Sequence, residues 1–315
     1  YNFYKKMIDI GDFIGVEGEV YQTQTGEVTV RAEKITLLSK TLRPLPEKFH
    51  GITDTEIKYR QRYLDLITNE DSRKIFLTRS KVVSFIRRYL EDNGFIEVET
   101  PILQTSVSGA SAKPFFTHHN ALDITCNLRI ATECHLKQCI GAGIDRVFEL
   151  GKDFRNEGMD PSHLQEFTQV EWYASYWNFE DNIKFFQTML VKLMKECLGT
   201  TKITYQGQEI EFDGKWPRID YVARMRELLG CDFLSIDDVD ALKKIVVERG
   251  LFGYSELEEC KTVRTLIDYV YKRKIRADIV NPTILYNYPA SLIPLARRND
   301  KDERIIDVFQ VVAGG

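Results

Sequence analysis

The stretch FRNEGMDPSHLQEFTQVEWY, residues 154–173, decides the fold because it ends one extended run and begins another. The run RVFELGKDFR (146–155) comes before a polar loop, and EFTQVEWYASY (166–176) follows that loop. Two extended runs joined in this way predict an antiparallel hairpin, which is a rigid element on which to mount functional groups. The hairpin carries a set of polar and aromatic side chains, namely Arg155, Glu157, His163, Phe167, Glu171 and Tyr173.

The loop end of this hairpin has the residue types of a nucleotide site. Arginine presents a planar fork that matches phosphate or carboxylate oxygens, and Arg155 ends the first run. Phe167, near the start of the second run, has a ring that can stack on a base. From the residues alone, a surface salt bridge for Arg155 and core packing for Phe167 remain open alternatives.

A second group of side chains indicates a site for ammonium groups. Glu171 and Tyr173 are two residues apart in a predicted strand, so they face the same side. Glu133 lies early in a predicted helix, where the helix dipole favours an anion. Two carboxylates and a phenol around one pocket suit a cationic ligand, although spacing alone also allows two unrelated surface glutamates.

Size and composition exclude several classes of protein. The chain has 315 residues, 43% hydrophobic and 29% charged, which predicts a globular protein of one or two domains. It contains no apolar run as long as a membrane span and no recognisable signal peptide, so we expect a cytoplasmic protein. The net charge of −4 argues against a general nucleic-acid coat, but permits a local basic surface. Six cysteines without a CxxC pair predict free thiols in a reducing compartment.

The mixed order of strands and helices predicts an α+β fold with an antiparallel sheet and helices packed around it. Residues 13–23 and 27–39 form an expected hairpin that turns at Gly26, as part of a small barrel, and 42–51 is an expected linker. Helices are expected at 71–92, 180–198, 218–229, 236–249 and 259–276. Other expected elements are a strand in 95–103 that stops at Pro101, strands at 283–287 and 305–313, a hairpin at 201–213, and a strand that becomes a helix over 128–143 with Thr132 as its N-cap.

Several familiar motifs are absent from the sequence. There is no Walker A, HExxH or GxSxG pattern. His118 and His119 are adjacent in a predicted strand and therefore point to opposite faces, which argues against a shared metal.

Six segments together resemble one known family across nearly the whole chain. GFIEVETPIL (94–103) resembles a motif 1 strand, and FRNEG with EFTQVE, within 154–171, resembles a motif 2 ATP hairpin. The chain thus resembles the bacterial-type class II lysyl-tRNA synthetases. The other segments that carry the resemblance to lysine-specific members are KTLRPLPEKFHG (40–51), YRQRYLDLI (59–67), SGASAKPFFTHHNALD (108–123) and LARRND (295–300).

The resemblance implies an architecture. It implies a class II synthetase-like antiparallel sheet with surrounding helices at 59–315, without the C-terminal motif 3 region. Residues 1–41 would be the C-terminal part of an OB-type anticodon-binding barrel, and 42–58 would be a linker. It also implies a homodimer formed through the strand at 94–103.

The resemblance further implies roles for individual residues in a reaction that uses ATP, Mg²⁺, lysine and tRNA(Lys). Arg155 would contact the lysine carboxylate and the α-phosphate, and is the expected catalytic residue. Glu157 and Phe167 would hold the adenine, and His163 would lie near the outer phosphates. For the amino acid, Glu133 and backbone at Gly109 would bind the α-amino group, while Glu171 and Tyr173 would meet the ε-ammonium.

Two departures from the family pattern shape the expectations. The sequence stops at FQVVAGG (309–315), so we expect a partial chain without motif 3, of low stability and inactive at this length. Gln310 stands where many relatives have a Mg²⁺-binding glutamate, so the metal ligands stay unknown. Two alternatives on the same scaffold are a non-catalytic binding module and a paralogue that lysylates proteins.

Overall fold

The computed structural model describes residues 6–43, 45, 52, 54–158, 160, 163–293 and 296–315. The chain divides into two compact units, residues 1–80 and 81–315, which are described separately. In the first unit the elements are β1 (Phe13–Gln22), β2 (Val28–Ser39), α2 (Thr55–Arg60) and α3 (Arg62–Thr68), and α4 (Glu70–Asp92) crosses the division.

β1 and β2 form the predicted hairpin. They pair antiparallel from Gln22–Val28 to Phe13–Ser39, with register shifts that mark bulges. The turn contains Gly26 at φ +85°, and its amide donates to the carbonyl of Thr23 at 2.9 Å. Glycine fits this left-handed position without steric cost. The hairpin is consistent with part of an OB-type barrel.

Helix α2 begins inside the segment that was predicted as a linker. Asp54 caps it, because its carboxylate accepts from the amides of Glu56 and Ile57. Most of the rest of the predicted linker lies outside the described residues. Farther along, Arg62 donates to the buried carboxylate of Asp65 at 2.6 Å, so this region has a packed polar contact of its own.

The second unit contains the remaining described elements, four of which are short helical turns. The strands are β3 (Ile96–Glu97), β4 (Leu103–Gln104), β5 (Phe116–His119), β6 (Ile124–Leu128), β7 (Arg146–Phe154), β8 (Glu166–Ala174), β9 (Lys202–Tyr205), β10 (Gln208–Glu211), β11 (Arg218–Asp220), β12 (Thr283–Pro289) and β13 (Ile305–Val312). The helices are α5 (Glu133–Gly141), α6 (Phe179–Leu193), α7 (Tyr221–Leu229), α8 (Val239–Glu248) and α9 (Val263–Lys274). The short turns are η1 (Met194–Leu198), η2 (Phe233–Ser235), η3 (Tyr254–Leu257) and η4 (Arg276–Asp278), besides the bridge at Asp160–His163.

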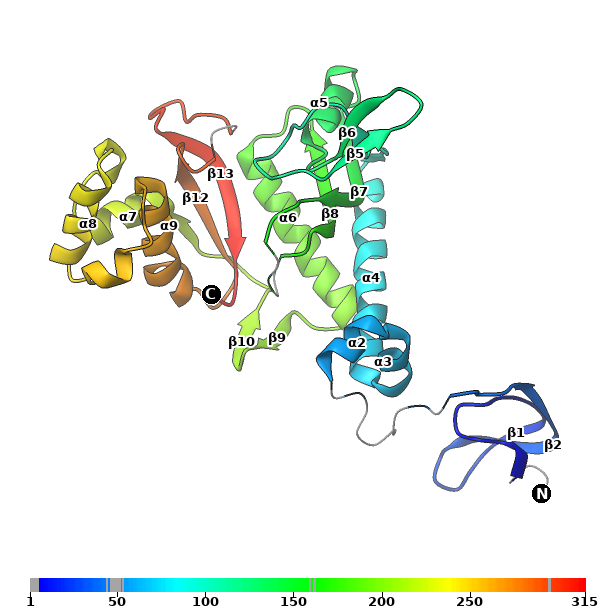
Figure 1. Ribbon diagram of the computed structural model, residues 1–315. Helices are drawn as coiled ribbons and strands as arrows, with labels where there is room; N and C mark the ends of the chain where they lie inside the picture. The colour runs from blue at the N-terminus through cyan, green and yellow to red at the C-terminus, as the bar shows by residue number, and fades with distance from the viewer. Residues whose placement is uncertain are drawn as a thin grey trace. The chain divides into compact units, whose positions relative to one another are not determined.

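The antiparallel hairpin of β7 and β8 is confirmed (Figure 1). Its register runs from Arg146–Ala174 to Phe154–Glu166, and the amide of Arg155 donates to the carbonyl of Gln165 at 2.8 Å. Strand β3 pairs with β7 in parallel, which gives a sheet in the order β3-β7-β8. Because side chains alternate along a strand, Phe167, Glu171 and Tyr173 share one face of β8.

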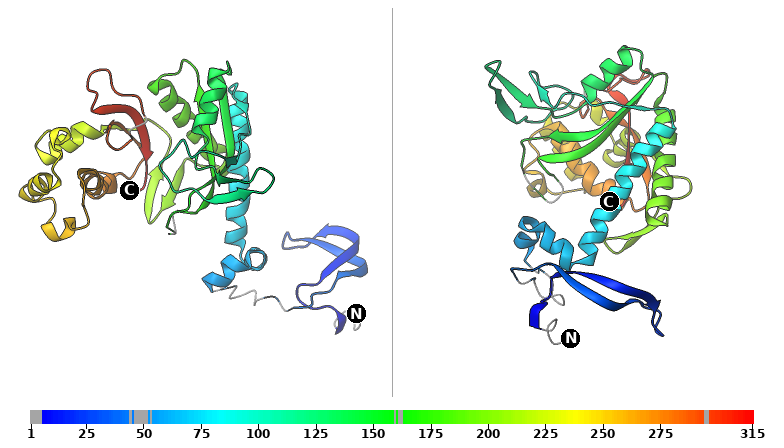
Figure 2. Two further views of the ribbon diagram at one scale, coloured as in Figure 1. Left: turned by 45° about the horizontal axis from the view of Figure 1, so that its top comes forward. Right: turned by 90° about the vertical axis from the view of Figure 1, so that its right-hand side faces the viewer.

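Helices α4 and α6 cover the opposite face of this sheet (Figures 1 and 2). Phe85 and Leu90 of α4 pack with Phe148 of β7 and Met189 of α6 in one buried cluster. Both helices were predicted from apolar residues at helical spacing. α6 begins with a capping box, in which Asn178 and Asp181 bond each other's backbone. Because α4 and α6 pack on this face, the face of β8 that carries Phe167, Glu171 and Tyr173 is the one available to a ligand.

The strand expected in 95–103, with its stop at Pro101, is shorter than predicted. The paired residues of β3 are Ile96–Glu97, and the amide of Val98 still donates to the carbonyl of Phe148 in β7 at 2.9 Å, while Leu103–Gln104 pairs with β6 in another sheet. Pro101, between the two, has no amide hydrogen and cannot continue a ladder. The break lets Thr100 turn its amide and hydroxyl towards Glu149.

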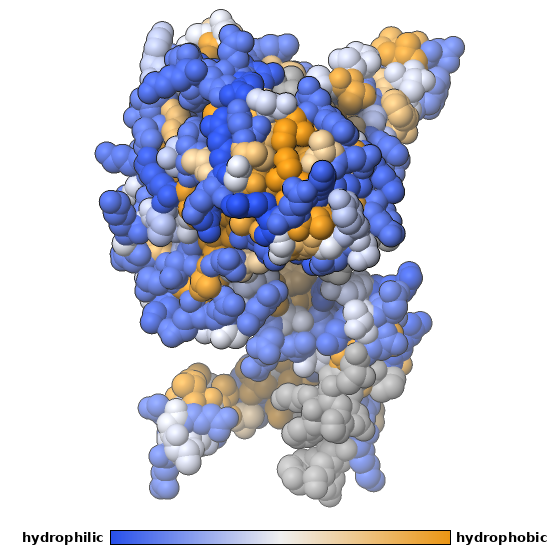
Figure 3. Space-filling model, turned by 90° about the vertical axis from the view of Figure 1, so that its left-hand side faces the viewer, coloured by the Kyte–Doolittle hydropathy of each residue, from blue (hydrophilic) through white to orange (hydrophobic). Residues whose placement is uncertain are grey.

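Residues 202–312 build a second layer around the sheet β11-β12-β13. Helices α7, α8 and α9 bury their apolar sides in one cluster with this sheet, including Met225, Val246, Leu266 and Ile306. The predicted helices and strands are present here with ends shifted by a few residues, and the hairpin of β9 and β10 turns at Gly207. The exception is 218–220, which was predicted as the start of a helix but forms β11 and pairs with β12 in parallel. The face on the left of Figure 1 is mostly hydrophilic, with an apolar patch near its middle (Figure 3).

Among the parts of the chain that the structure describes, no helix combines the length and apolar character needed to cross a membrane.

Candidate active site

The residues predicted to bind a nucleotide line one cavity at the loop end of the β7–β8 hairpin. The cavity measures about 640 Å³, large enough for a nucleotide-sized ligand. Its described lining is Arg155, Glu157, Gly158, Asp160, His163, Leu164 and Phe167. All four predicted ATP residues are therefore brought together, and Asp160 and Leu164 are added to them.

Arg155 lies over the ring of Phe167 rather than in a surface ion pair. Its guanidinium carbon is 5.2 Å from the ring centroid, and its Nε donates to the carbonyl of Ile130 at 3.3 Å. Phe167 is half-buried and lines the cavity rather than one of the buried clusters. Of the alternatives left open by the sequence, the cavity arrangement is the one observed. A cation beside a ring can hold an anionic group next to a stacked base.

Glu157 and His163 have local polar partners. The carboxylate of Glu157 accepts from the amide of Lys113 at 3.3 Å, and its carbonyl accepts from the Gln165 side chain at 3.3 Å. His163 is exposed, and its Nδ1 is 2.7 Å from a carboxylate oxygen of Asp160. The segment that contains Lys113, part of the motif-like stretch at 108–123, thus borders the nucleotide cavity.

The carboxylate of Glu171 lies on the face of β8 opposite to α4 and α6, and three side chains donate hydrogen bonds to it. It accepts from the hydroxyl of Thr132 at 3.0 Å, the amide of Gln169 at 2.8 Å and the hydroxyl of Tyr173 at 2.7 Å. Burial, and then the hydrogen bond to Glu171, raise the pKa of Tyr173. The phenol therefore stays protonated and donates, so this pair presents an oriented negative charge.

Thr132 occupies the N-cap position of α5, as predicted, but its side chain does not cap the helix. Its hydroxyl donates to Glu171 instead. The sequence could have pointed to Gln169 as well, because it alternates with Phe167 and Glu171 on the same strand face.

Glu133 begins α5 next to Gly109. A side chain at Gly109, which has φ +85°, would press on Glu133 Cβ at 3.3 Å, so glycine allows the close approach. Lys137, one helical turn later, places its Nζ 2.5 Å from Glu133 Oε1 and 5.9 Å from the centroid of the Tyr173 ring. Glu133, Tyr173 and Glu171 therefore surround a common region, and Lys137 is a site residue that sequence reasoning missed.

Gln310 lies apart from this cavity. It is on β13, where the hydroxyl of Tyr288 donates to its Oε1 at 3.1 Å, and it lines a different cavity of about 370 Å³. Among the residues that the structure describes, no cluster of three or more His, Cys, Asp or Glu side chains could hold a metal ion.

Comparison with known proteins agrees with this geometry. Residues 54–315 match the family described as tRNA synthetases class II (D, K and N). The chain is 43% identical over 306 residues to lysine–tRNA ligases of Bacillus cereus and Bacillus anthracis, a span of 97% of this chain and 60% of each relative. It is 42% identical over 310 residues to lysine–tRNA ligase of Staphylococcus aureus, across 98% of this chain and 62% of that protein. The chain thus spans about 60% of the length of these relatives. It belongs to the class II tRNA synthetases of the D, K and N group.

Proposed function

We propose that this protein activates lysine with ATP to lysyl-adenylate and transfers the lysyl group to the 3′ end of tRNA(Lys). The observation that carries the proposal is that a nucleotide-sized cavity around Arg155 and Phe167 shares the β7–β8 hairpin with Glu171, and that Glu133 at the start of α5 borders the same region as Glu171. The names of the similar relatives support lysine as the amino acid.

The chemistry assigns a distinct task to each group. A lysine carboxylate oxygen forms a bond to the α-phosphorus while the bond from that phosphorus to the bridging oxygen breaks, and pyrophosphate leaves with the electron pair. Because two anions must meet, the fixed positive charge of Arg155 provides positioning and charge neutralisation. A ribose hydroxyl at the 3′ end of the tRNA then attacks the lysyl carbonyl, and AMP leaves.

Selection of lysine rests on charge in this proposal. Glu133 and backbone at Gly109 bind the α-amino group, while Glu171, oriented by Tyr173, binds the ε-ammonium. An amino acid without the second ammonium would leave the Glu171 carboxylate unpaired, at a cost of about 1–3 kcal/mol. This cost favours lysine over neutral amino acids of similar length.

Mg²⁺ commonly accompanies ATP in such a reaction, where it screens phosphate charge. The described residues offer no group of acidic ligands, and Gln310 is a neutral amide bonded to Tyr288. We therefore assign no protein ligand to the metal and route no step through it.

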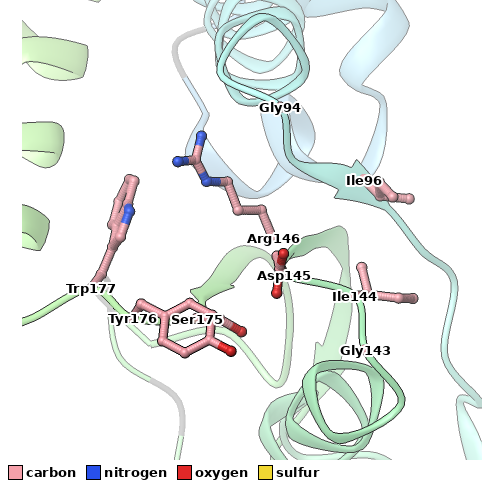
Figure 4. Close-up of a pocket in the computed structure, with 9 residues that line it drawn as sticks. All are labelled: Gly94, Ile96, Gly143, Ile144, Asp145, Arg146, Ser175, Tyr176 and Trp177. Atoms are coloured by element: carbon pink, nitrogen blue, oxygen red, sulfur yellow. The ribbon is translucent and has the colours of Figure 1, made fainter.

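A second copy of the chain is the proposed partner along residues 94–103. Phe95 is buried in the core, whereas Ile96, Ile102 and Leu103 remain 55%, 43% and 53% exposed. Next to Ile96, a hollow of about 590 Å³ is lined by Arg146, Tyr176 and others, in which Arg146 points towards Gly94 and Tyr176 points away from it (Figure 4). Exposed apolar residues along one edge support an interface. The cytoplasmic location stays a prediction.

The test of the proposed function is amino-acid-dependent exchange between ATP and pyrophosphate, measured for all twenty amino acids on purified protein of recorded mass. Exchange with lysine alone, followed by charging of tRNA(Lys), is the expected result. Lysine binding without exchange would support the non-catalytic alternative, and lysine transfer to protein in place of tRNA would support the protein-lysylating one.

A further inference from the structure

Arg129 is a buried arginine that lies beneath the candidate site and does not line the nucleotide cavity. Only 1% of it is exposed. Its Nε donates to the carbonyl of Lys152 at 2.8 Å, and its Nη1 donates to the carbonyl of Thr100 at 3.0 Å. A buried guanidinium is costly unless it is paired, so these contacts fix its position closely.

Glu149 completes the network around this guanidinium. Its carboxylate pairs with Nη1 of Arg129 and also accepts from the hydroxyl and amide of Thr100, at 2.6 and 3.2 Å. A side chain at Gly151 would collide with Nη2 of Arg129. The network thus joins three segments that are distant in sequence, and a glycine leaves room for it.

The five residues that begin at Arg129 touch both halves of the candidate site. The carbonyl of Arg129 accepts from the amide of Phe154 at 3.0 Å, and the carbonyl of Ile130 accepts from Nε of Arg155 at 3.3 Å. Three residues along, the hydroxyl of Thr132 donates to Glu171 at 3.0 Å, and Glu133 follows directly. One short segment therefore holds the arginine of the nucleotide half and the carboxylates of the amino-acid half.

We propose that Arg129 is a positioning residue that holds segment 129–133 in the single arrangement that both ATP and lysine require. This inference rests on the proposed function, but assigns the role to a residue that would touch neither ATP nor lysine. If the segment is loosened, each ligand binds only the fraction of molecules in which it is ordered. Both affinities then fall by the same factor, and whichever ligand binds first restores the affinity for the other.

The experiment uses two variants of the purified protein. Gly151→Ala pushes on the guanidinium without changing charge, and Arg129→Lys keeps the charge but loses the planar fork. Calorimetry would measure binding of lysine, of a non-hydrolysable ATP analogue, and of lysine at saturating analogue. Met189→Ala is the control, because this buried residue of α6 packs on the opposite face of the sheet.

We expect both variants to weaken lysine and the analogue by a similar factor, about 10-fold, and saturating analogue to return lysine affinity to within about 2-fold of the unmodified protein. Met189→Ala should lower the melting temperature and leave both dissociation constants unchanged. If Arg129→Lys does not fold, the binding data for Gly151→Ala test the inference alone, because this variant adds only one methyl group and keeps the arginine.

Weakening of only one ligand, or equal weakening without rescue by the other, would overturn the inference while leaving the proposed function intact. Failure of the unmodified protein to bind lysine at all would instead reject the proposed function, and with it the inference.

Discussion

At the scale of single residues, the side chain with the most unusual surroundings is Asp153. It is 1% exposed, and neither carboxylate oxygen receives a hydrogen bond among the described residues. Arg129 lies 3.2 Å away, but its Nε donates to the carbonyl of Lys152 and its Nη1 pairs with Glu149. Burial therefore raises the pKa of Asp153 despite the attraction of Arg129. The network therefore gives hydrogen bonds to the buried carboxylate of Glu149, but none to that of Asp153 among the described residues.

A pH dependence of stability follows from this raised pKa. A raised pKa means that the folded state binds the proton more tightly than the unfolded state, so folding is favoured at low pH. Stability contributed by this group is lost as pH rises from the ordinary aspartate pKa of about 3.9 through the raised value. We expect Asp153→Asn to gain stability relative to the unmodified protein over that window. Urea unfolding at several pH values would measure the difference, and a difference independent of pH would contradict this reading.

The candidate residues that the sequence grouped, and that lie together in the structure, are close along the chain. Arg155 and Phe167 were found because they flank one loop, and Glu171 and Tyr173 because strand periodicity sets them on one face. Arg129 and Glu149 were missed, because they are twenty residues apart and their pairing depends on how separate segments pack. No local pattern distinguishes such a buried pair from two surface charges.

Among the helices and strands, α5 leads to a prediction because it places the Lys137 ammonium beside Glu133 and the ring of Tyr173. Lys137 pairs with Glu133 one turn earlier, although Glu133 is also the proposed partner of the substrate α-amino group. The pair is partly exposed, and such pairs contribute about 0.2–1 kcal/mol. The α-ammonium of the substrate lysine must therefore compete with the Lys137 ammonium for the Glu133 carboxylate. We expect Lys137→Met to lower the KM for lysine about 2–5-fold, while Lys137→Arg, which keeps the charge, leaves it nearly unchanged.

Steady-state exchange kinetics would measure both KM values. A higher KM in Lys137→Met would show that Lys137 orients the Glu133 carboxylate and does not compete with the substrate for it.

The elements themselves were largely predictable, with instructive exceptions. The helices α4 and α6 and the β7–β8 hairpin follow from apolar periodicity and turn residues. The strand expected to run up to Pro101 ends earlier, because its ladder pairing with β7 stops after Glu97, and Thr100 turns its amide and hydroxyl towards Glu149. The position of Thr132 at the start of α5 was predictable, but its hydroxyl donates to the Glu171 carboxylate, a charge-assisted hydrogen bond, and does not accept from the helix amides.

At the scale of the whole molecule, the arrangement of elements leads to a prediction about assembly. Ile102 is exposed beside Leu103 on the segment proposed to meet a second copy. A charge placed in an apolar interface would have to be desolvated, so Ile102→Glu should weaken self-association. Tyr254→Glu is the matched control, because Tyr254 is also exposed but lies in η3, far along the chain. Light scattering after gel filtration should show a dimer for the control and a smaller species for Ile102→Glu. Equal masses for both variants would remove this segment from the interface.

We propose that Glu171 on the β7–β8 hairpin recognises the side-chain ammonium of lysine next to the nucleotide cavity. Lysine-dependent exchange of ATP and pyrophosphate by Glu171→Gln, with Glu166→Gln as control, would test this role. Glu166 lies on the same strand but is exposed and pairs with Lys152. Loss of the charge pair between Glu171 and the bound ammonium should cost about 2–4 kcal/mol, and so lower kcat/KM for lysine by about 30- to 1,000-fold. Glu166→Gln should exchange normally. Normal exchange by Glu171→Gln would contradict the account.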